Sequence, residues 1–586
     1  MLYYVRDGSG NRIAASRGAL LIDVLAQAGL MAHDFPCSRK GICRKCLVKV
    51  KTGEQWRDVL SCQTLVESDF EIDLSHSGRV VAICLQEGIG RRTTLLPAIR
   101  KIYFESLPGN KILHWEDLCS RSGILDGEGI AADVDVLKAI AEFGQNDTAF
   151  TSVVRSNEVI AVEIGDTRSE LYGMAFDIGT TTVVGYLLNL CDGRMLATAS
   201  ALNPQVRYGA DVISRITYAE KEQDGLDRLR SCIVECINGL IGEAVKRAQI
   251  SPQAVYDLVF VGNPCMHHLF LGILPTALGR YPYQPVMRSP ISFNARRIGL
   301  EINEKASLYW LPGVSGFVGA DTVGMLLAHP LQDEEGVTLA VDIGTNGEIV
   351  LALHGELWAC SAAAGPAFEG YSMTSGMRAQ TGAIDDVRIE TSGVSYHVIG
   401  EVKPQGICGS GIIDAAAGLV RTKNLDLSGK LVLSDNSDDV SGRIVERDGS
   451  LAFLLVPSDQ TQDGREILIT QKDIRHLQLA KAAISTGIGL LLREAGVLLN
   501  DVTKVILAGA FGLYLKPESI KSIRLIPEAM CDKIIAVGNA AGVGAQNALL
   551  SLEDRKTAQE LAKKIRYVEL AGRKDFEDLF LEELSF

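Results

Sequence analysis

The fold of this chain is decided by the stretch Ala340-Val-Asp-Ile-Gly-Thr-Asn-Gly-Glu-Ile349. It predicts a buried apolar strand that ends at Asp342, a glycine turn, and a second strand from Glu348 to Leu353. A turn of this kind exposes backbone N–H groups and hydroxyls to which phosphate oxygens can bind. The aspartate is well placed to hold Mg²⁺ through water, because that ion usually keeps several of its waters.

The same pattern occurs earlier, in Ala175-Phe-Asp-Ile-Gly-Thr-Thr-Thr182, which is followed by an apolar run to Leu190. After each copy comes a glycine turn and then a third predicted strand, 195–200 in the first case and 357–362 in the second. A single Asp-Ile-Gly-Thr is weak evidence, because buried strands often end in such turns. Two copies with matching continuations are much stronger.

The match continues further along each half. An apolar strand ends in glycine at 258–262 and again at 505–509, and a helix start rich in small residues follows at 316–321 and at 542–546. This internal duplication predicts two similar α/β lobes that face each other, each contributing one phosphate loop to a nucleotide cleft. The alternative is a duplicated α/β fold that binds no nucleotide.

With these motifs, residues 172–586 resemble the actin/sugar-kinase/hexokinase superfamily of ATPases. The resemblance implies that both hairpins grip the phosphates of ATP, that Asp177 and Asp342 organise Mg²⁺, and that a glycine-rich strand end meets adenosine. It also places Asp321 at the border of the cleft, as a candidate to position water or metal, although an ordinary surface or capping role fits equally well. The nucleotide contacts expected from the resemblance are Gly179, Thr180, Thr181, Thr182, Gly344, Thr345, Asn346, Gly347, Glu348, Gly509, Ala510, Phe511 and Gly512.

A further anion site is expected where Gly409, Ser410 and Gly411 open an apolar helix. Free N–H groups and the helix dipole favour negative charge at such a start, so a phosphate of ATP can bind there. Two other runs are distinctive but suggest no chemistry of their own, Asn203–Arg215 and Gly262–Leu269. In the second, His267 and His268 are adjacent and would point in different directions on a helix, which favours a structural role over metal binding.

Composition restricts the remaining possibilities. The chain has 586 residues, 47% of them apolar, and a net charge of −14, so we expect several domains and no nucleic-acid partner. No apolar run is long enough to span a membrane, and the first residues lack the pattern of a signal peptide. We therefore expect a cytoplasmic protein in which the thirteen cysteines do not form a disulfide framework.

Four cysteines follow a pattern of their own: Cys37, Cys43, Cys46 and Cys62. A loop with three thiolates can wrap one side of a cluster while a nearby segment supplies the fourth, an arrangement similar to plant-type [2Fe–2S] proteins. A helix predicted at 20–29 and a strand at 47–51 flank the loop, and the whole resembles a β-grasp ferredoxin. The alternative is a structural zinc site, although such sites more often use two close pairs of cysteines.

The predicted architecture is therefore an α/β multidomain chain. We expect an N-terminal β-grasp [2Fe–2S] ferredoxin domain at 1–85, a linker at 86–108, a small α+β middle domain at 109–171, and the duplicated ATPase at 172–586. The lobes of the ATPase are expected at about 172–336 and 337–586.

This combination of domains, together with the runs quoted above, resembles the reductive activators of corrinoid proteins. The family resemblance implies an ATP-hydrolysing iron–sulfur reductase that returns the cobalt(II) corrinoid of a methyltransferase partner to cobalt(I). It implies a [2Fe–2S] cluster, ATP and Mg²⁺ as cofactors and a low-potential electron donor as a second partner, and it leaves a homodimer open. One departure is Ser38-Arg39-Lys40, where smaller, glycine-rich residues are expected after the first cysteine.

Three other functions were weighed against this one. A small-molecule kinase shares the superfamily but gives no reason for an attached cluster. A redox switch that binds nucleotide only as a signal would not hydrolyse ATP. Activators of radical dehydratases resemble chains with a bridging cluster and no ferredoxin domain.

Overall fold

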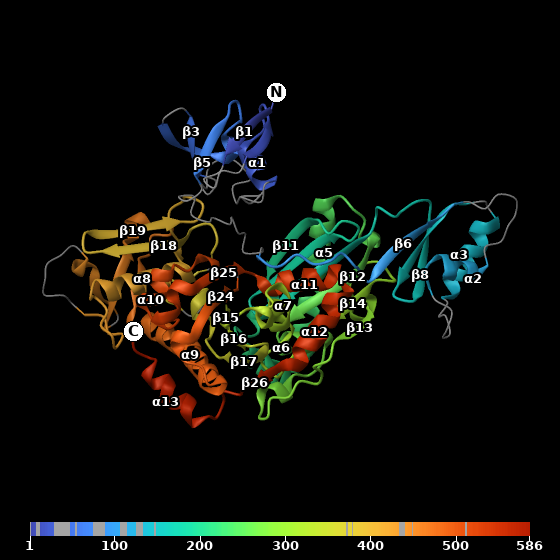
Figure 1. Ribbon diagram of the computed structural model, residues 1–586. Coiled ribbons are helices and arrows are strands. Elements are labelled where there is room, and N and C mark those ends of the chain that lie inside the picture. Colours follow the sequence, from blue (N-terminus) through green and yellow to red (C-terminus); the bar gives the residue numbers. More distant parts are fainter. Residues whose placement is uncertain are drawn as a thin grey trace. The chain divides into compact units, whose positions relative to one another are not determined.

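A computed structural model describes residues 2–6, 12–27, 47–52, 55–73, 88–105, 114–124, 133–145, 148–370, 373–377, 379–432, 440–447, 449–509 and 512–586. The chain divides into two compact units, Met1–Glu87 and Gly88–Phe586 (Figure 1). Each is described separately below.

The first unit is built on a five-stranded mixed sheet. Its strand order is β2-β1-β5-β3-β4, with β1 parallel to β5 and antiparallel to β2. Val5, Val48 and Ile72 of the sheet and Leu21 of α1 are fully or almost fully buried in one core, as the alternating pattern of 47–51 predicts for a sheet with one covered face. The elements are β1 (Leu2–Arg6), β2 (Arg12–Ser16), α1 (Leu21–Gln27), β3 (Leu47–Thr52), β4 (Gln55–Leu60) and β5 (Phe70–Asp73).

The second unit begins with a small three-stranded sheet that carries two helices. Residues 99–104, which we expected to belong to a linker, form its strand β6 and pair with β7, so the linker is shorter than predicted. The elements are β6 (Ile99–Phe104), α2 (Trp115–Arg121), α3 (Val134–Gln145), β7 (Phe150–Arg155) and β8 (Glu158–Ile164). Lys101 and the hydroxyl of Tyr256 both contact the carboxylate of Glu163, which attaches this sheet to the next one.

The first large sheet has the strand order β11-β10-β9-β12-β14-β13. β9 is antiparallel to β10 and parallel to β12. Its strands are β9 (Tyr172–Ile178), β10 (Thr182–Asn189), β11 (Met195–Leu202), β12 (Val255–Gly262), β13 (Ile291–Asn294) and β14 (Ser307–Trp310). Its helices are α4 (Val212–Lys221), α5 (Gly225–Ala248), α6 (Pro264–Leu271) and α7 (Ala320–Ala328).

The second large sheet repeats this order as β17-β16-β15-β24-β25, with β26 added beside β17. β15 is antiparallel to β16 and parallel to β24, so the predicted duplication is confirmed at the level of strand order and direction. Its strands are β15 (Val337–Ile343), β16 (Gly347–Leu353), β17 (Glu356–Ala362), β24 (Val502–Ala508), β25 (Ile534–Gly538) and β26 (Ile565–Tyr567).

The second half also contains two three-stranded sheets. They are formed by β18 (Ala383–Glu390), β19 (Gly393–Val398) and β20 (Gly406–Ile407), and by β21 (Ile444–Arg447), β22 (Ser450–Val456) and β23 (Ile467–Thr470). The helices of this half are α8 (Gly409–Arg421), α9 (Gln471–Ala495), α10 (Pro517–Ser522), α11 (Ala540–Leu550), α12 (Leu552–Lys564) and α13 (Lys574–Glu582).

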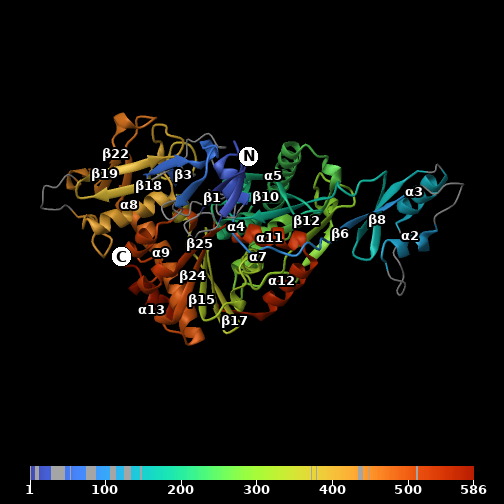
Figure 2. The same ribbon diagram turned by 45° about the horizontal axis from the view of Figure 1, so that its top comes forward.

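Helices α11 and α12 follow β25 of the second large sheet in sequence but pack on the first half of the duplication. α11 packs on β9, β12 and α7, and α12 packs on α7. Both ribbon views show α7, α11 and α12 side by side (Figures 1 and 2). Arg555 of α12 forms a buried ion pair with Asp257 of β12. α7 and α11 cross closely at glycines, because a Cβ on Gly544 would lie only 1.9 Å from the carbonyl oxygen of Gly324. The two halves therefore share a helical junction.

Candidate functional site: two hairpins around a carboxylate cluster

The two predicted phosphate loops are hairpin turns at equivalent places in the two large sheets. Asp177 lies at the end of β9 and Asp342 at the end of β15, each just before the turn that leads into the antiparallel partner strand. The turns meet, because the hydroxyls of Thr181 and Thr345 are 3.1 Å apart. The duplication thus brings two stretches 164 residues apart in sequence to one place.

Four carboxylates gather at these turns: Asp177, Asp321, Asp342 and Glu348. Burial raises the pKa of Asp177 and of Asp342 to about 7. The charge of Asp321 contributes to both of these shifts, and that of Asp177 contributes to the shift of Asp342. Burial likewise raises the pKa of Asp321 and of Glu348, the latter strongly. Each of the four side chains keeps some contact with solvent, so the cluster can be reached by a ligand.

This donor set fits a hard cation that is held partly through water. The raised pKa values of the clustered carboxylates arise from burial and from neighbouring negative charges, so a bound cation would be stabilised there. Carboxylate oxygens are also the ligands that Mg²⁺ prefers. Within the described part of the chain, no three acidic, histidine or cysteine side chains converge closely enough to bind a metal ion directly. Mg²⁺ usually uses one or two carboxylates together with waters and substrate phosphates, so the cluster suits that mode.

The distinctive run Asn203–Arg215 donates hydrogen bonds to the backbone of the first hairpin. The Asn203 amide donates to the carbonyl of Gly179 at 2.9 Å, and the Arg215 guanidinium donates to the carbonyl of Thr180 at 2.5 Å. Arg215 is fully buried and also donates to the carbonyl of Gly209. The run therefore fixes the backbone that the sequence assigns to phosphate binding.

The second distinctive run contributes in the same way. Asn263 caps α6 by accepting from the N–H of Met266, and its amide donates to the hydroxyl of Thr180 at 3.0 Å. The neighbouring histidines are structural, as expected. His267 stacks on Trp310 with ring centroids 4.1 Å apart, and His268 bonds the carbonyl of Pro264 and the N–H of Val286.

Asn539 is a residue that sequence reasoning missed. Its amide donates to the carboxylate of Asp177 at 2.8 Å, from the turn between β25 and α11. A signal was present, because Val537-Gly-Asn539 repeats the Val261-Gly-Asn263 that precedes α6.

The glycine-rich strand end lies beside the second hairpin. Gly509 has a positive φ of 88°, and a Cβ there would lie 2.7 Å from a carboxylate oxygen of Asp342. Gly512 begins a short helical turn, Gly512–Tyr514, while Ala510 and Phe511 lie outside the described residues. Only glycine permits this approach of the backbone to Asp342.

Other predicted contacts are placed less directly. Asp321 is in the first turn of α7 and accepts a hydrogen bond from the N–H of Thr322. Gly409, Ser410 and Gly411 begin α8 and are buried against β18, where the Ser410 hydroxyl donates to the carbonyl of Asp385. Thr182, Gly344 and Asn346 lie in or beside the two turns.

Of the cysteine quartet, Cys62 is described, whereas Cys37, Cys43 and Cys46 lie outside the described residues. Cys62 is buried in the short helical turn Ser61–Gln63 that follows β4. The Thr64 hydroxyl, which donates to the carbonyl of Leu60, fixes this turn.

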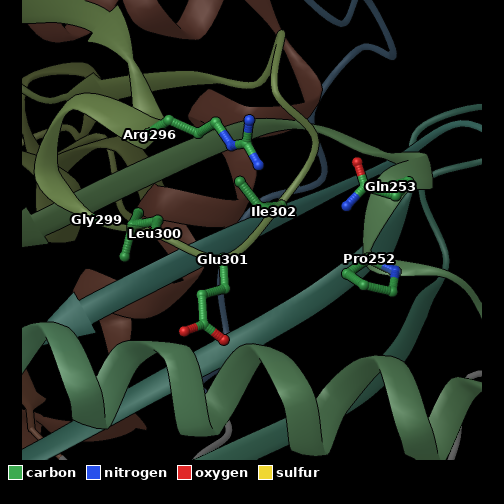
Figure 3. A pocket seen from close by; sticks show the side chains of 7 residues that line it. All are labelled: Pro252, Gln253, Arg296, Gly299, Leu300, Glu301 and Ile302. Carbon is green, nitrogen blue, oxygen red and sulfur yellow. The ribbon is translucent and has the colours of Figure 1, made fainter.

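An open cavity of about 540 Å³ lies elsewhere on the first half. Figure 3 shows the guanidinium of Arg296 and the carboxylate of Glu301 on opposite sides of the residues that line this cavity. None of the predicted site residues lines it. The full lining is Pro252, Gln253, Arg296, Gly299, Leu300, Glu301 and Ile302.

The structure has two α/β lobes with the same strand order, and each lobe contributes a phosphate-type hairpin beside the carboxylate cluster. These features define a nucleotide-binding ATPase fold, which is here preceded by a β-grasp unit. Comparison with protein-family models agrees with this class. Residues 5–67 match the 2Fe-2S iron-sulfur cluster binding domain, residues 172–334 the RACo middle region, and residues 336–586 the C-terminal domain of RACo, described as the ASKHA domain.

Individual proteins are similar over most or all of the chain. The corrinoid activation enzyme RamQ of Eubacterium limosum is 35% identical over 98% of this chain and 97% of its own length. A [Co(II) methylated amine-specific corrinoid protein] reductase of Methanosarcina barkeri is 26% identical over 71% of this chain and 77% of its own. The solved structure of a reductive activator for corrinoid, iron-sulfur protein matches with a TM-score of 0.78 and 32% identity, over 100% of this chain and 98% of that one.

The chain therefore belongs to the RACo family, the reductive activators of corrinoid proteins. The family assignment favours the [2Fe–2S] cluster over zinc for the cysteine quartet. No helix in the described ranges combines the length and apolar character needed to cross a membrane.

Proposed function

We propose that this protein is an ATP-dependent reductive activator. It transfers one electron from its [2Fe–2S] cluster to the cobalt(II) corrinoid of a methyltransferase-system corrinoid protein, which restores cobalt(I). The observation that carries the proposal is that one chain joins a match to a [2Fe–2S] binding domain with an ATPase fold whose two hairpins meet at a carboxylate cluster. The names of its relatives, a corrinoid activation enzyme and a Co(II) corrinoid protein reductase, support the same reaction.

The proposal assigns a role to individual residues. The N–H groups and hydroxyls at 179–182 and 344–347 bind the phosphates of ATP, and residues 509–512 lie against adenosine. Asp177 and Asp342 hold Mg²⁺ through water, while Asp321 and Glu348 add negative charge beside them. When bound, Mg²⁺ neutralises phosphate charge. The start of α8 at Gly409–Gly411 is a further phosphate contact.

In the first unit, Cys37, Cys43, Cys46 and Cys62 hold the cluster, which supplies one-electron transfer when bound. Burial of Cys62 keeps water from its sulfur. A low-potential electron donor returns the oxidised protein to its reduced state, so one electron enters for each cobalt that is reduced. The chain acts as a monomer or homodimer in the cytoplasm.

The energetics explain why nucleotide is needed. Plant-type [2Fe–2S] centres lie near about −400 mV, and cobalt(I) corrinoids are stronger reductants, so the electron moves uphill. Each 100 mV costs about 2.3 kcal/mol per electron. Nucleotide-dependent closure of the lobes can supply this by stabilising a complex in which the cobalt is easier to reduce.

For the domain limits, we propose 1–85 for the ferredoxin domain, a linker from 86 to 98, a middle domain to 171, and ATPase lobes at 172–336 and 337–586. The linker ends before β6 because that strand is part of the middle sheet.

The test mixes the reduced protein with Mg-ATP and a cobalt(II) corrinoid protein and follows the corrinoid absorption spectrum. We expect conversion to cobalt(I) with ATP and none without it. Conversion at the same rate without nucleotide would overturn the proposal, and so would a colourless, iron-free protein after anaerobic reconstitution. A phosphorylated small molecule in the mixture would favour a kinase instead.

A further inference from the structure

Asn539 occupies the point where the two halves of the ATPase fold meet the nucleotide site. It follows β25 of the second large sheet and begins α11, while its partner Asp177 ends β9 of the first. Its two side-chain atoms do different work. The carbonyl oxygen accepts from the N–H of Gly542 at 2.7 Å and caps α11, and the amide nitrogen donates to Asp177 Oδ2 at 2.8 Å.

An asparagine suits this place for an electrostatic reason. A lysine or arginine in contact with Asp177 would cancel its charge, whereas a neutral amide fixes one carboxylate oxygen and leaves the charge available. The charge that acts on Asp177 is that of Asp321 on α7, which has the same sign. The hydrogen bond therefore orients Asp177 without competing with a cation.

The backbone of Asn539 is itself held from the other side. Residues Gly88–Leu96, which we call the strap, connect the first unit to β6. Gly88 pairs with Gly538, and the N–H of Ile89 donates to the carbonyl of Val537 at 2.7 Å. A Cβ on Gly88 would lie 2.4 Å from the carbonyl oxygen of Asn539, so the strap and this residue are in tight contact.

The strap is fixed along its length to the helical junction. The N–H of Arg91 donates to the carbonyl of Ala328 at the end of α7, and its guanidinium pairs with Asp554 of α12. Thr93 also donates to Asp554, and Leu96 exchanges backbone hydrogen bonds with Leu550 and Leu552. The strap thus touches β25, α7, α11 and α12, the elements that surround Asn539.

We propose that Asn539 is a positioning residue of the nucleotide site, which holds the Asp177 carboxylate in the orientation that Mg-ATP requires, and that the strap keeps Asn539 in this role. The inference rests on the proposed function, because it assumes that nucleotide binds at the two hairpins. In this arrangement the strap contacts Asn539, and Asn539 in turn contacts Asp177 of the nucleotide site.

The first test replaces Asn539 with serine. Serine is also a good N-cap, so the N-terminus of α11 remains capped. The shorter serine hydroxyl cannot cap Gly542 and also hold Asp177 in place of the lost amide. Binding of a fluorescent ATP analogue to the full chain is measured with Mg²⁺ and with EDTA. We expect about a tenfold loss of affinity with Mg²⁺, the size of one lost hydrogen bond to a charged group, and little change with EDTA.

The matched control is Asn303→Ser, an equally buried asparagine whose amide donates to the carbonyl of Gln253 and whose side-chain oxygen accepts from the N–H of Lys305, away from the cluster and the strap. It should bind the analogue like the wild type. An equal loss for Asn539→Ser with Mg²⁺ and with EDTA would indicate a merely structural role and overturn the inference, as would no loss at all. If the wild type itself binds no analogue, the proposed function fails.

The second test concerns the strap and leaves Asn539 intact. Gly88→Ala places a methyl group against the Asn539 carbonyl, and we expect a several-fold loss of Mg²⁺-dependent affinity although residue 88 contacts no ligand. The control is Gly242→Ala on α5, where a Cβ meets no atom within 4 Å. Wild-type affinity in Gly88→Ala would show that the strap does not hold Asn539.

Discussion

At the scale of single residues, the molecule concentrates unfavourable charge where it needs a ligand. Asp177 and Asp342 each have a pKa of about 7 in place of the usual value near 4, chiefly because they are buried and face other carboxylates. A protein that folded only for stability would not keep this arrangement. The repulsion would instead be relieved if a cation and phosphates occupied the site, as the proposed function requires.

Asp342→Asn should therefore separate stability from function. A carboxyl group with a raised folded pKa costs nothing below the unfolded pKa near 4, and its cost grows as pH rises toward 7. Removing the charge should stabilise the nucleotide-free protein by roughly 1–2 kcal/mol at pH 8 and by much less at pH 4, since solvent contact reduces the full effect. ATP hydrolysis should be lost.

The measurement is urea unfolding at both pH values, together with phosphate release from ATP. Cluster absorbance serves as the control, because Asp342 lies outside the unit that holds Cys62. A variant that is equally stabilised at pH 4 and pH 8 would contradict the assigned cause, and unchanged hydrolysis would contradict the assigned role.

A buried histidine gives the opposite pH dependence. Burial, with a contribution from His268, lowers the pKa of His267 to about 3, so this residue is neutral when folded. The unfolded chain takes up a proton below about pH 6.5, and stability should be complete above that pH and fall as the pH decreases toward 3. The loss is at most about 1.4 kcal/mol per pH unit for this group.

His267→Phe keeps a flat ring to stack on Trp310 and cannot be protonated. We expect it to be more resistant to acid, with a smaller fall in melting temperature between pH 6.5 and pH 4.5 than the wild type shows. Melting curves across this range provide the measurement. Identical pH dependence in the two proteins would mean that other groups control acid unfolding.

At the scale of elements, each phosphate-type hairpin depends on parts of the chain that are distant in sequence. Arg215 lies on α4. Its guanidinium donates hydrogen bonds to the carbonyls of Thr180 and Gly209 and to the side-chain oxygen of Gln205. A guanidinium has five N–H donors, so one buried arginine can hold several carbonyl oxygens at once. The first hairpin is thus part of a wider support, formed by the runs that were distinctive in sequence.

Replacing Arg215 with methionine should show this support. The side chain keeps its length, but the carbonyls lose their donor, and we expect a loss of about 2–4 kcal/mol in stability together with weaker nucleotide binding. Urea unfolding and analogue binding measure the two effects. The control is Arg207→Met in the same run, whose exposed side chain bonds only its own turn, and which should cost less than about 1 kcal/mol.

The elements show clearly what the sequence could predict. The strands around Asp177 and Asp342 were predictable, because apolar runs followed by Asp-Ile-Gly-Thr define a local structure whose repetition implies two similar sheets. β6 was not, since glycines and prolines around 88–109 mark turns but do not reveal that Ile99–Phe104 pairs with β7. The roles of Arg215 and Asn539 were also hidden, because their partners are a backbone carbonyl and a carboxylate far away in sequence. The roles of all the site residues remain predictions, and Ala510, Phe511 and three of the four cysteines also lie outside the described residues.

At the scale of the whole molecule, two units share one chain and one task. α7 and α11 cross where Gly324 and Gly544 allow backbone contact, and the strap lies against the same junction. α11 belongs to the second half by sequence and packs on β9, β12 and α7 of the first, so a change in the angle between the two large sheets would act on this junction. The strap, which follows the first unit in sequence, is therefore bonded to this helical junction.

This connection predicts how two inactive variants behave when they are mixed. Cys62→Ser should lose the cluster and all cobalt reduction while it still binds nucleotide, and Asp342→Asn should keep the cluster but not hydrolyse ATP. If the strap transmits closure within one polypeptide, a mixture of the two should reduce a cobalt(II) corrinoid protein no faster than either variant alone. Recovery of a substantial fraction of wild-type activity would mean that one chain's nucleotide site serves another chain's cluster, as in a homodimer that works across its interface. Mixing each variant with wild-type protein provides the control, because activity should then fall only in proportion to dilution. The corrinoid spectrum, recorded with Mg-ATP and a chemical reductant, measures every arm, and it distinguishes coupling along one chain from coupling between chains.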